Sequence, residues 1–549
     1  MEYMGIVECA SSARLYVDDI IMHGYKPLII NPKGVSEFYL SYREMMSKEI
    51  GDKAEYIDED EDFDVFIEKL KSYNLKAVFI GSDTGVRLAD RINKALGLKG
   101  NDPATSYLRV TKKGMYEALG KAGIRRIESR VVTCDNDIRE FWNEYALDKC
   151  VLKFSEGAGT VGLKICKTIE EAIEHYRYML GAESLIPTDE HTILIQEYIG
   201  GTEYIVNTLS CDGKHMVTDM WRYNKVTGDD GSILYDHVML LKDLEPGHSD
   251  MVQYAYRVLD AVDMKWGIGH IEIKIDRKGP VLIETNVRPM GLAMTQAYLD
   301  EALGYHQTDL AVDVYLDPAM FSRYARKVYN PPKYALMKLM IVPEDMVGSF
   351  EPIFILSNMI KSTREVLFFG KDGVNSYART IDLETSPLAI KMINSDYGAL
   401  MKDYELLRIA EKRYFHLFYT LGEDLEPQKL TTNINRILDL SDRNKKILVV
   451  TDDDQYAWQY GQRIETDGHE VYDGALYAVC KGQKAEERYR QIFRTIRNIR
   501  SGGPFVAVPE SYRSMTYGSV AMDFLMNIGG VRIILPAYEA NDVVYGVKK

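Results

Sequence analysis

The sequence feature that constrains the fold most is a β-hairpin signal in residues 269–289. Two β-rich runs flank a tight-turn tripeptide centred on Lys278. Glu272 and Glu284 both lie six positions from that centre, so a regular hairpin places these two carboxylates opposite each other. Because side chains alternate along a strand, Asn286 shares a face with Glu284.

Two carboxylates and an amide oxygen on one face are a set of hard oxygen ligands. Such ligands suit Mg²⁺ or Mn²⁺, and like charges directly opposite each other otherwise destabilise a strand pair. The hairpin therefore predicts a divalent-cation site formed by Glu272, Glu284 and Asn286. The alternative interpretation is an acidic hairpin face exposed to solvent.

Charge and cysteine usage limit the partners and the compartment. The chain has 549 residues, with 82 acidic and 67 basic side chains and a formal net charge of -15. This balance argues against general nucleic-acid binding and a polybasic membrane surface, but it allows one local anion site. The six cysteines include no C-x-x-C pair, which fits a reducing cytosol better than a disulfide scaffold or a zinc ribbon. No apolar run approaches the ~18 residues of a membrane span, so we expect a cytoplasmic protein without nucleic-acid or membrane partners.

Hydrophobic patterning divides the chain into four regions. Residues 1–105 alternate apolar runs with helical spacing, which is typical of a parallel sheet covered by helices. In residues 106–330 strand signals outnumber helix signals and predict an antiparallel α+β lobe. Residues 331–425 predict a small α/β lobe, and residues 430–549 a further Rossmann-like α/β domain whose role the sequence leaves unknown. The expected fold class is a multidomain combination of α/β and α+β.

A glycine-rich loop follows the apolar strand signal of residues 150–154. Lys153 lies near the end of that strand. Glycine lets backbone N–H groups approach phosphate oxygens closely, so this loop is a candidate phosphate cradle. It lacks the ending of a Walker A loop and no helix follows at once, and a plain hairpin turn is the alternative. The loop residues concerned are Gly157, Gly159, Thr160 and Gly162.

A third candidate element begins with the apolar strand signal at Ile193. It leads into Gln196, Glu197, Tyr198 and Ile199, whose backbone can read the edge of an adenine ring. Glu203 follows, where a carboxylate can accept hydrogen bonds from ribose hydroxyls. By itself this segment also fits an edge strand and a turn.

Taken in chain order, these elements resemble the ATP-grasp superfamily of carboxylate–amine ligases. The order is a helix lysine (Lys112), the lysine and glycine loop, the adenine-edge strand with its later glutamate, and the Glu-x-Asn-x-Arg hairpin. The resemblance runs from about Met4 to at least Pro318. Two departures are Asp83, where relatives often have glutamate, and Lys153-Phe154 in place of Lys-Pro.

The resemblance implies a role for each of these residues. Lys112 and Lys153 would contact ATP phosphates, and Arg288 would stabilise the γ-phosphate and an acyl-phosphate. The glycine loop would close over the triphosphate as part of a lid at about residues 125–192. The adenine would contact Gln196–Ile199, the ribose Glu203, and one or two magnesium ions would contact Glu272, Glu284 and Asn286.

Within the superfamily the chain is most similar to the L-amino acid ligases that make dipeptides. His270 two residues before Glu272, the Glu-x-Asn-x-Arg-Pro run, and residues 379–384 before 406–408 carry this resemblance. It implies that a carboxylate, an amino acid by this resemblance, attacks ATP to give an acyl-phosphate, ADP and phosphate. An amine then forms the amide. The implied partners are these small molecules, and the resemblance allows a homodimer.

Several alternatives stay open from the sequence. The same fold serves carboxylases and other metabolite ligases of the biotin carboxylase and purine-pathway type, and it serves as a regulatory module without turnover. The intact set of Glu272, Glu284, Asn286 and Arg288 argues against a regulatory module that has lost turnover. His270 either contacts substrate or is a satisfied interior histidine, and Arg222 either faces the acceptor pocket or belongs to an aromatic core strand. The isolated cysteines fit the core better than catalysis.

Overall fold

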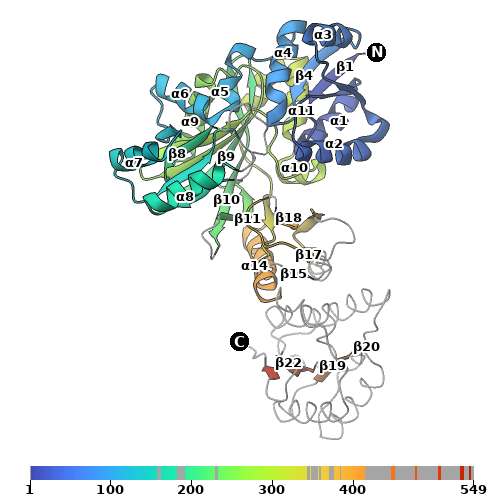
Figure 1. Ribbon diagram of the computed structural model, residues 1–549. Helices are drawn as coiled ribbons and strands as arrows, with labels where there is room; N and C mark the ends of the chain where they lie inside the picture. The colour runs from blue at the N-terminus through green and yellow to red at the C-terminus, as the bar shows by residue number, and fades with distance from the viewer. Residues whose placement is uncertain are drawn as a thin grey trace. The chain divides into compact units, whose positions relative to one another are not determined.

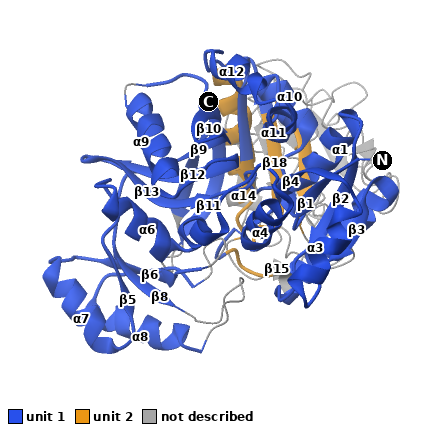
Figure 2. Cartoon of the chain, turned by 90° about the horizontal axis from the view of Figure 1, so that it is seen from above, with its two compact units in different colours: residues 1–337, 381–384, 393–395 blue, residues 338–380, 385–392, 396–549 orange. Residues whose placement is uncertain are grey.

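The computed structural model describes most of the chain as far as residue 414 and short strands beyond it. The described residues are 2–156, 162–181, 192–228, 233–245, 247–342, 346–347, 357, 360–369, 376–383, 385–414, 447–451, 477–478, 505–507, 532–536 and 543–545. The chain forms two compact units (Figure 2). Unit 1 comprises Met1–Met337, Ile381–Glu384 and Ile393–Ser395, and unit 2 comprises Lys338–Thr380, Thr385–Met392 and Asp396–Lys549. The four-domain division stays a prediction.

Unit 1 begins with a parallel sheet, as the sequence predicts (Figure 1). Its order is β3-β2-β1-β4, and every neighbouring pair is parallel. Successive side chains face opposite sides, so Val7 packs in the core that contains α3 and α4, and Ile6 in the core that contains α1 and α2. The elements are β1 (Tyr3–Val7), α1 (Leu15–Met22), β2 (Lys26–Asn31), α2 (Glu37–Ile50), β3 (Glu55–Asp58), α3 (Phe63–Lys71), β4 (Leu75–Ile80) and α4 (Val86–Leu96).

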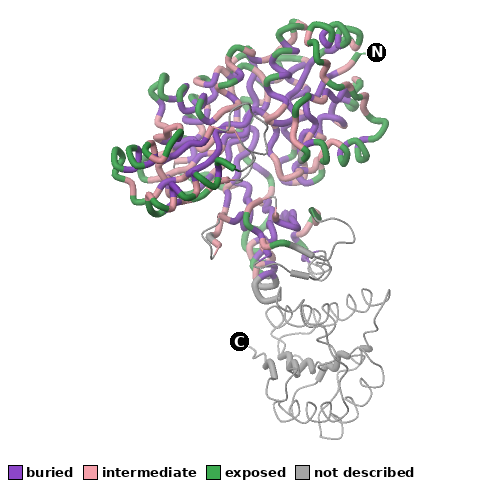
Figure 3. Tube along the Cα trace, viewed as in Figure 1, coloured by how far each residue is buried: buried purple, intermediate pink, exposed green. Residues whose placement is uncertain are grey.

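An antiparallel sheet in the order β13-β12-β9-β10-β11 forms the centre of unit 1. Its apolar side chains pack on α6 and α9 on one side and on α11 on the other, and buried residues dominate this interior (Figure 3). The strands are β9 (Thr202–Cys211), β10 (Lys214–Thr227), β11 (Ile233–Leu240), β12 (Gly267–Asp276) and β13 (Gly279–Asn286). The helices are α5 (Tyr107–Val110), α6 (Lys112–Lys121), α9 (His248–Ala261), α10 (Gln296–Leu303), α11 (Gln307–Leu316) and α12 (Ala319–Ala325).

A smaller antiparallel sheet occupies the region predicted to be the lid. Its order is β5-β8-β6-β7, and α7 and α8 cover it with a core of their own around Phe141 and Leu152. Thr168 caps α8, because its hydroxyl accepts from the backbone of Glu171 at 3.1 Å. The elements are β5 (Ser129–Val132), α7 (Asp135–Glu144), β6 (Cys150–Phe154), β7 (Lys164–Cys166), α8 (Ile169–Met179) and β8 (Ile193–Glu197).

Strand β14 (Tyr334–Leu339) contains the boundary between the units. In unit 2, β16 (Thr363–Phe368) pairs antiparallel with β18 (Leu388–Asn394), β15 (Met346–Val347) pairs with β17 (Ser376–Tyr377), and α14 spans Tyr397–Tyr414. The C-terminal strands have the order β20-β19-β21-β22-β23 with three parallel pairs. They are β19 (Ile447–Thr451), β20 (Tyr477–Ala478), β21 (Phe505–Ala507), β22 (Arg532–Pro536) and β23 (Val543–Tyr545). The other residues of the predicted Rossmann-like domain at 430–549 lie outside the described residues.

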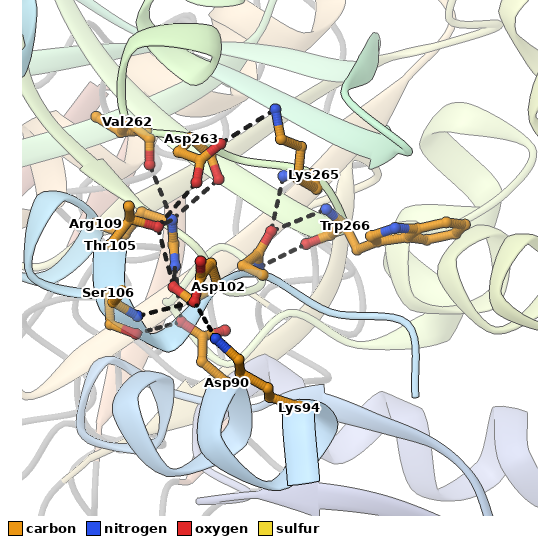
Figure 4. Close-up of polar contacts among 12 residues, drawn as sticks. Asp90, Lys94, Asp102, Thr105, Ser106, Arg109, Val262, Asp263, Lys265 and Trp266 are labelled. Carbon is orange, nitrogen blue, oxygen red and sulfur yellow. Dashed lines mark hydrogen bonds and ion pairs between the residues drawn. The ribbon is translucent and has the colours of Figure 1, made fainter. Parts of the chain in front are cut away.

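A buried ion pair joins two elements of unit 1. Arg109 and Asp90 lie 2.9 Å apart and connect α4 to the segment before α6 (Figure 4). The Arg109 guanidinium also donates to the carbonyl oxygens of Val262 and Asp263 in the turn that precedes β12.

None of the described helices combines the length and the apolar composition that a membrane crossing requires.

Candidate active site

Glu272 on β12 pairs with Glu284 on β13 as predicted, but the hairpin is not regular. Its turn is Arg277-Lys278, and a bulge between Glu272 and Ile273 brings the two glutamates opposite each other. The Asn286 amide donates to Glu284 Oε1 at 3.2 Å. The two carboxylates and the amide therefore meet on one face, as the alternation of the strands predicts.

Two lysines face this hairpin from different elements. Lys112 is the first residue of α6, where the capping hydroxyl of Thr111 accepts from Gly114 at 2.9 Å. The Lys112 backbone N–H donates to the Ser155 carbonyl at 3.1 Å, directly after β6. The Lys112 ammonium lies 2.7 Å from Glu284 Oε2. The helix start and the strand end thus bring Lys112 and Lys153 to the same place.

The charges in this cluster shift one another's pKa. Burial, aided by the nearby charge of Lys112, lowers the pKa of Lys153 to about 7. Burial raises the pKa of Glu284, but the charges of Lys112 and Lys153 outweigh it and lower that pKa to about 2. Lys153 forms no salt bridge with any residue in the described part of the chain. Its amine lies 5.9 Å from the centroid of the Tyr116 ring, so Lys153 lines the site without a carboxylate partner among the described residues.

A cavity of about 390 Å³ contains most of the predicted residues. That volume lies within the usual range of small-molecule sites. Gln196 is buried, and its side chain lies beside Tyr116. The cavity is lined, among others, by Lys112, Lys153, Gln196, Glu197, Tyr198, Ile199, Glu203, Glu272 and Glu284.

Glu203 has two basic partners that sequence reasoning missed. Lys225 on β10 lies 2.6 Å from Glu203 Oε1, and Lys274 on β12 lies 3.8 Å from Oε2. Lys274 also donates to the Ile199 carbonyl at 3.1 Å. Both lysines line the cavity. The alternation of the strands could have indicated the face on which each lysine lies, but pairing with Glu203 depends on the order of the strands.

The remaining predicted residues lie around the cavity rather than on its lining. Arg288 follows β13, and its Nε lies 3.0 Å from Asp83 Oδ2, which raises the pKa of Arg288 although burial lowers it. His270 is buried between Asn207 and Glu272.

The Arg222 side chain lies beside Met239 on the neighbouring strand β11. Gly162 has a φ of +72°, and a Cβ there would lie 2.7 Å from the Phe154 ring. Gly157, Gly159 and Thr160 lie outside the described residues.

The donor set fits magnesium. Mg²⁺ is usually held by one or two carboxylates together with substrate phosphates and water, not by an all-protein cage. Glu272 and Glu284 supply the two carboxylates, and the Asn286 side chain lies beside them with its amide nitrogen directed at Glu284.

The fold and the cavity residues can be compared with protein families, similar proteins and solved structures. The ATP-grasp domain family matches residues 148–296, a stretch that includes Lys153, the adenine-edge strand and the carboxylate hairpin. The chain contains an ATP-grasp domain. The resemblance predicted from the motifs is thereby confirmed, and so is the predicted fold class.

Similar proteins include ligases of small molecules. Dapdiamide A synthase of Enterobacter agglomerans is 25% identical over 429 residues, which cover 76% of this chain and 97% of that protein. The D-alanine–D-alanine ligase of Halalkalibacterium halodurans is 29% identical over 237 residues, 41% of this chain and 73% of that protein. The crystal structure of the L-amino acid ligase from Bacillus licheniformis shares the fold, with a TM-score of 0.57 at 15% identity, over 74% of this chain and 97% of that one. These findings support ATP-dependent carboxylate–amine ligation by this ATP-grasp chain.

Proposed function

We propose that the protein is an ATP-dependent ligase that joins the carboxylate of an amino acid to an amine through an acyl-phosphate, releasing ADP and phosphate. The observation that carries this proposal is the pair of lysines facing the two hairpin carboxylates in one 390 Å³ cavity. A triphosphate and its cation need charges of both signs in one place. The cavity offers them beside a pocket for an adenine.

The chemistry follows from charge. A substrate carboxylate attacks the γ-phosphorus of ATP, so two anions must approach each other. Lys112 and Lys153 bind and orient the phosphates, and Arg288, which pairs with Asp83 beside the cavity, supplies a further positive charge for the group that is transferred. Glu272, Glu284 and Asn286 would hold magnesium, which when bound neutralises phosphate charge. An amine then captures the acyl-phosphate, and the lid sheet β5-β8-β6-β7 excludes water that would compete for it.

A second, smaller cavity supports an amino acid as the acid substrate. It has a volume of about 20 Å³ and is lined by Met290 and Met294, which follow Arg288 closely in the chain, and by the buried Asp219 and Trp221. A volume of that size holds one water-sized group, so we propose that it receives a small substrate group. The loop here places Leu292 and Ala293 at positive φ of 67° and 45°, and such backbone strain clusters at functional sites.

The test is incubation with ATP, Mg²⁺ and pools of amino acids, followed by mass spectrometry and measurement of ADP. Condensed products that appear with equimolar ADP and phosphate support the proposal. Release of AMP and pyrophosphate would contradict the acyl-phosphate route. Bicarbonate-dependent ADP release without an amine would point to a carboxylase, and nucleotide binding without turnover to a regulatory module.

A further inference from the structure

One buried carboxylate of the cavity lies between two lysines. Glu203 near the start of β9 is 6% exposed, and the central sheet places β9 between β12 and β10. Lys225 on β10 lies 2.6 Å from its Oε1, and Lys274 on β12 lies 3.8 Å from its Oε2. One ammonium at 2.6 Å balances the charge of one carboxylate, so the second lysine needs a further reason.

The two lysines differ in how they contact Glu203. The Lys225 ammonium donates a hydrogen bond to Oε1 and lies 4.2 Å from the centroid of the Tyr235 ring. Lys274 is too far from Oε2 for a hydrogen bond. Its side chain is only 18% exposed, and burying an ammonium is costly unless it is hydrogen-bonded. The ion pair with Glu203 therefore does not by itself account for Lys274.

Lys274 makes its hydrogen bond with the segment that joins β8 to β9. The ammonium donates to the Ile199 carbonyl at 3.1 Å and lies 5.6 Å from the centroid of the Tyr198 ring. The segment lies directly against β12, because a Cβ at Gly201, where φ is +91°, would collide with the Ile275 carbonyl. One ammonium thus contacts both the segment predicted to read the adenine and the carboxylate predicted to hold the ribose.

We propose that Lys274 is a positioning residue of the nucleoside site, whose ammonium holds the Ile199 carbonyl and the Glu203 carboxylate in place before ATP binds. The inference rests on the proposed function, because a nucleoside contacts these groups only there. Groups that are ordered before a ligand arrives lose less conformational freedom on binding. The phosphates have other partners, Lys112 and Lys153, so the loss of Lys274 should weaken binding of the nucleoside and spare that of the phosphates.

The first experiment compares a ligand with and without its nucleoside. Titration calorimetry in the presence of Mg²⁺ measures the Kd of ATP and the Kd of inorganic tripolyphosphate. Lys274→Met should raise the Kd of ATP by about 10-fold and leave the Kd of tripolyphosphate unchanged. Lys265→Met is the matched control, because Lys265 precedes β12 and forms an exposed pair with Asp263, and it should bind both ligands like the wild type. Equal losses for both ligands would indicate general damage to the cavity and overturn the proposal, and so would an unchanged Kd of ATP.

The second experiment tests the hydrogen bond by rescue and by turnover. Lys274→Arg retains a charged donor and should recover most of the ATP affinity, whereas Lys274→Gln, which is shorter and uncharged, should not. Lys274→Met should raise the KM for ATP while kcat stays near that of Lys265→Met, because the nucleoside contacts are alike in the ground and transition states.

Two outcomes would overturn the proposal in these measurements. One is an affinity of Lys274→Arg as weak as that of Lys274→Met, and the other is a fall in kcat with an unchanged KM for ATP. If Lys274→Met does not fold, Lys274→Gln takes its place in both experiments. A wild type that binds ATP but ligates nothing contradicts the proposed function alone, because the binding constants need no turnover.

Discussion

Unit 1 buries two clusters of charged side chains that differ in what surrounds them. In the first, the Arg109 guanidinium lies against Asp90 and also donates to Thr105 and to the carbonyl oxygens of Asp102, Val262 and Asp263 (Figure 4). In the second, Lys112, Lys153 and Glu284 line a cavity of about 390 Å³. Protein atoms surround the Arg109 guanidinium, and we call this the closed cluster. The cluster of Lys112, Lys153 and Glu284 lines a cavity that can receive a ligand, and we call it the open cluster.

The difference shows why burial of charge does not by itself indicate a functional site. Burial raises the pKa of Asp90, and Arg109 opposes that shift, which is what a paired structural group shows. Lys153 has a lowered pKa but no salt bridge with a described residue, and it lines the cavity beside the Tyr116 ring. Changes in the closed cluster should therefore affect stability, and changes in the open cluster should affect activity.

The largest expected effect is on the closed cluster. Replacing Arg109 by methionine leaves Asp90 buried without its cation, and we expect the free energy of unfolding to fall by roughly 3–5 kcal/mol. Urea denaturation measures it. Arg177→Met is the control, since Arg177 forms a largely exposed pair with Asp135, and it should cost less than about 1 kcal/mol. Similar losses in both variants would contradict the distinction.

In the open cluster the effect should appear in turnover. Glu284→Gln removes the charge that faces Lys112, and we expect ADP release to fall by about 10²–10³-fold, as for the loss of one stabilising group. Stability should change less than in Arg109→Met. The control Glu44→Gln alters an exposed pair with Lys48 on α2 and should turn over like the wild type. Full activity of Glu284→Gln would sink the assignment of the cavity.

A third cluster of the closed kind predicts a pH dependence of stability. Burial lowers the pKa of His306, but hydrogen bonds and charges from Asp19 and Asp300 outweigh it and raise the pKa from 6.5 to about 9. The stabilisation is complete below pH 6.5 and is lost as the pH rises through 9. It is on the order of 3 kcal/mol. Unfolding free energies of the wild type and His306→Gln, compared between pH 6 and pH 10, should converge as the pH rises, and a constant difference would contradict the prediction.

The smallest effect concerns the 20 Å³ cavity. Met294→Ala should enlarge it and shift the relative kcat/KM towards acid substrates with larger side chains by about 10-fold, the usual size of a methylene-scale discrimination. ADP release with a panel of amino acids measures the shift. Leu303→Ala is the control, because Leu303 is buried on α10 but does not line this cavity. A substrate profile shared by both variants would argue against a specificity role.

Much of the site could be predicted because its signals are local. Glu272 pairs with Glu284 as the count of positions from Lys278 predicts, but the two-residue turn Arg277-Lys278 alone would place Glu272 opposite Ile283. A bulge between Glu272 and Ile273, which the count did not include, restores the pairing of the two glutamates. The apolar strand signal at residues 150–154 predicts β6 with the bounds that the structure shows, and Lys112, predicted to lie on a helix, is the first residue of α6. Each of these predictions uses a periodic pattern within about a dozen residues.

The sequence by itself determined the type of chemistry, namely a carboxylate hairpin, two lysines and an adenine-edge strand in one chain order. Only the tertiary structure decided which side chains meet across the sheet, because the order β12-β9-β10 brings together residues far apart in the sequence. That order places Lys225 and Lys274 on Glu203. The order itself results from how several apolar faces share one core, which no local stretch of sequence encodes.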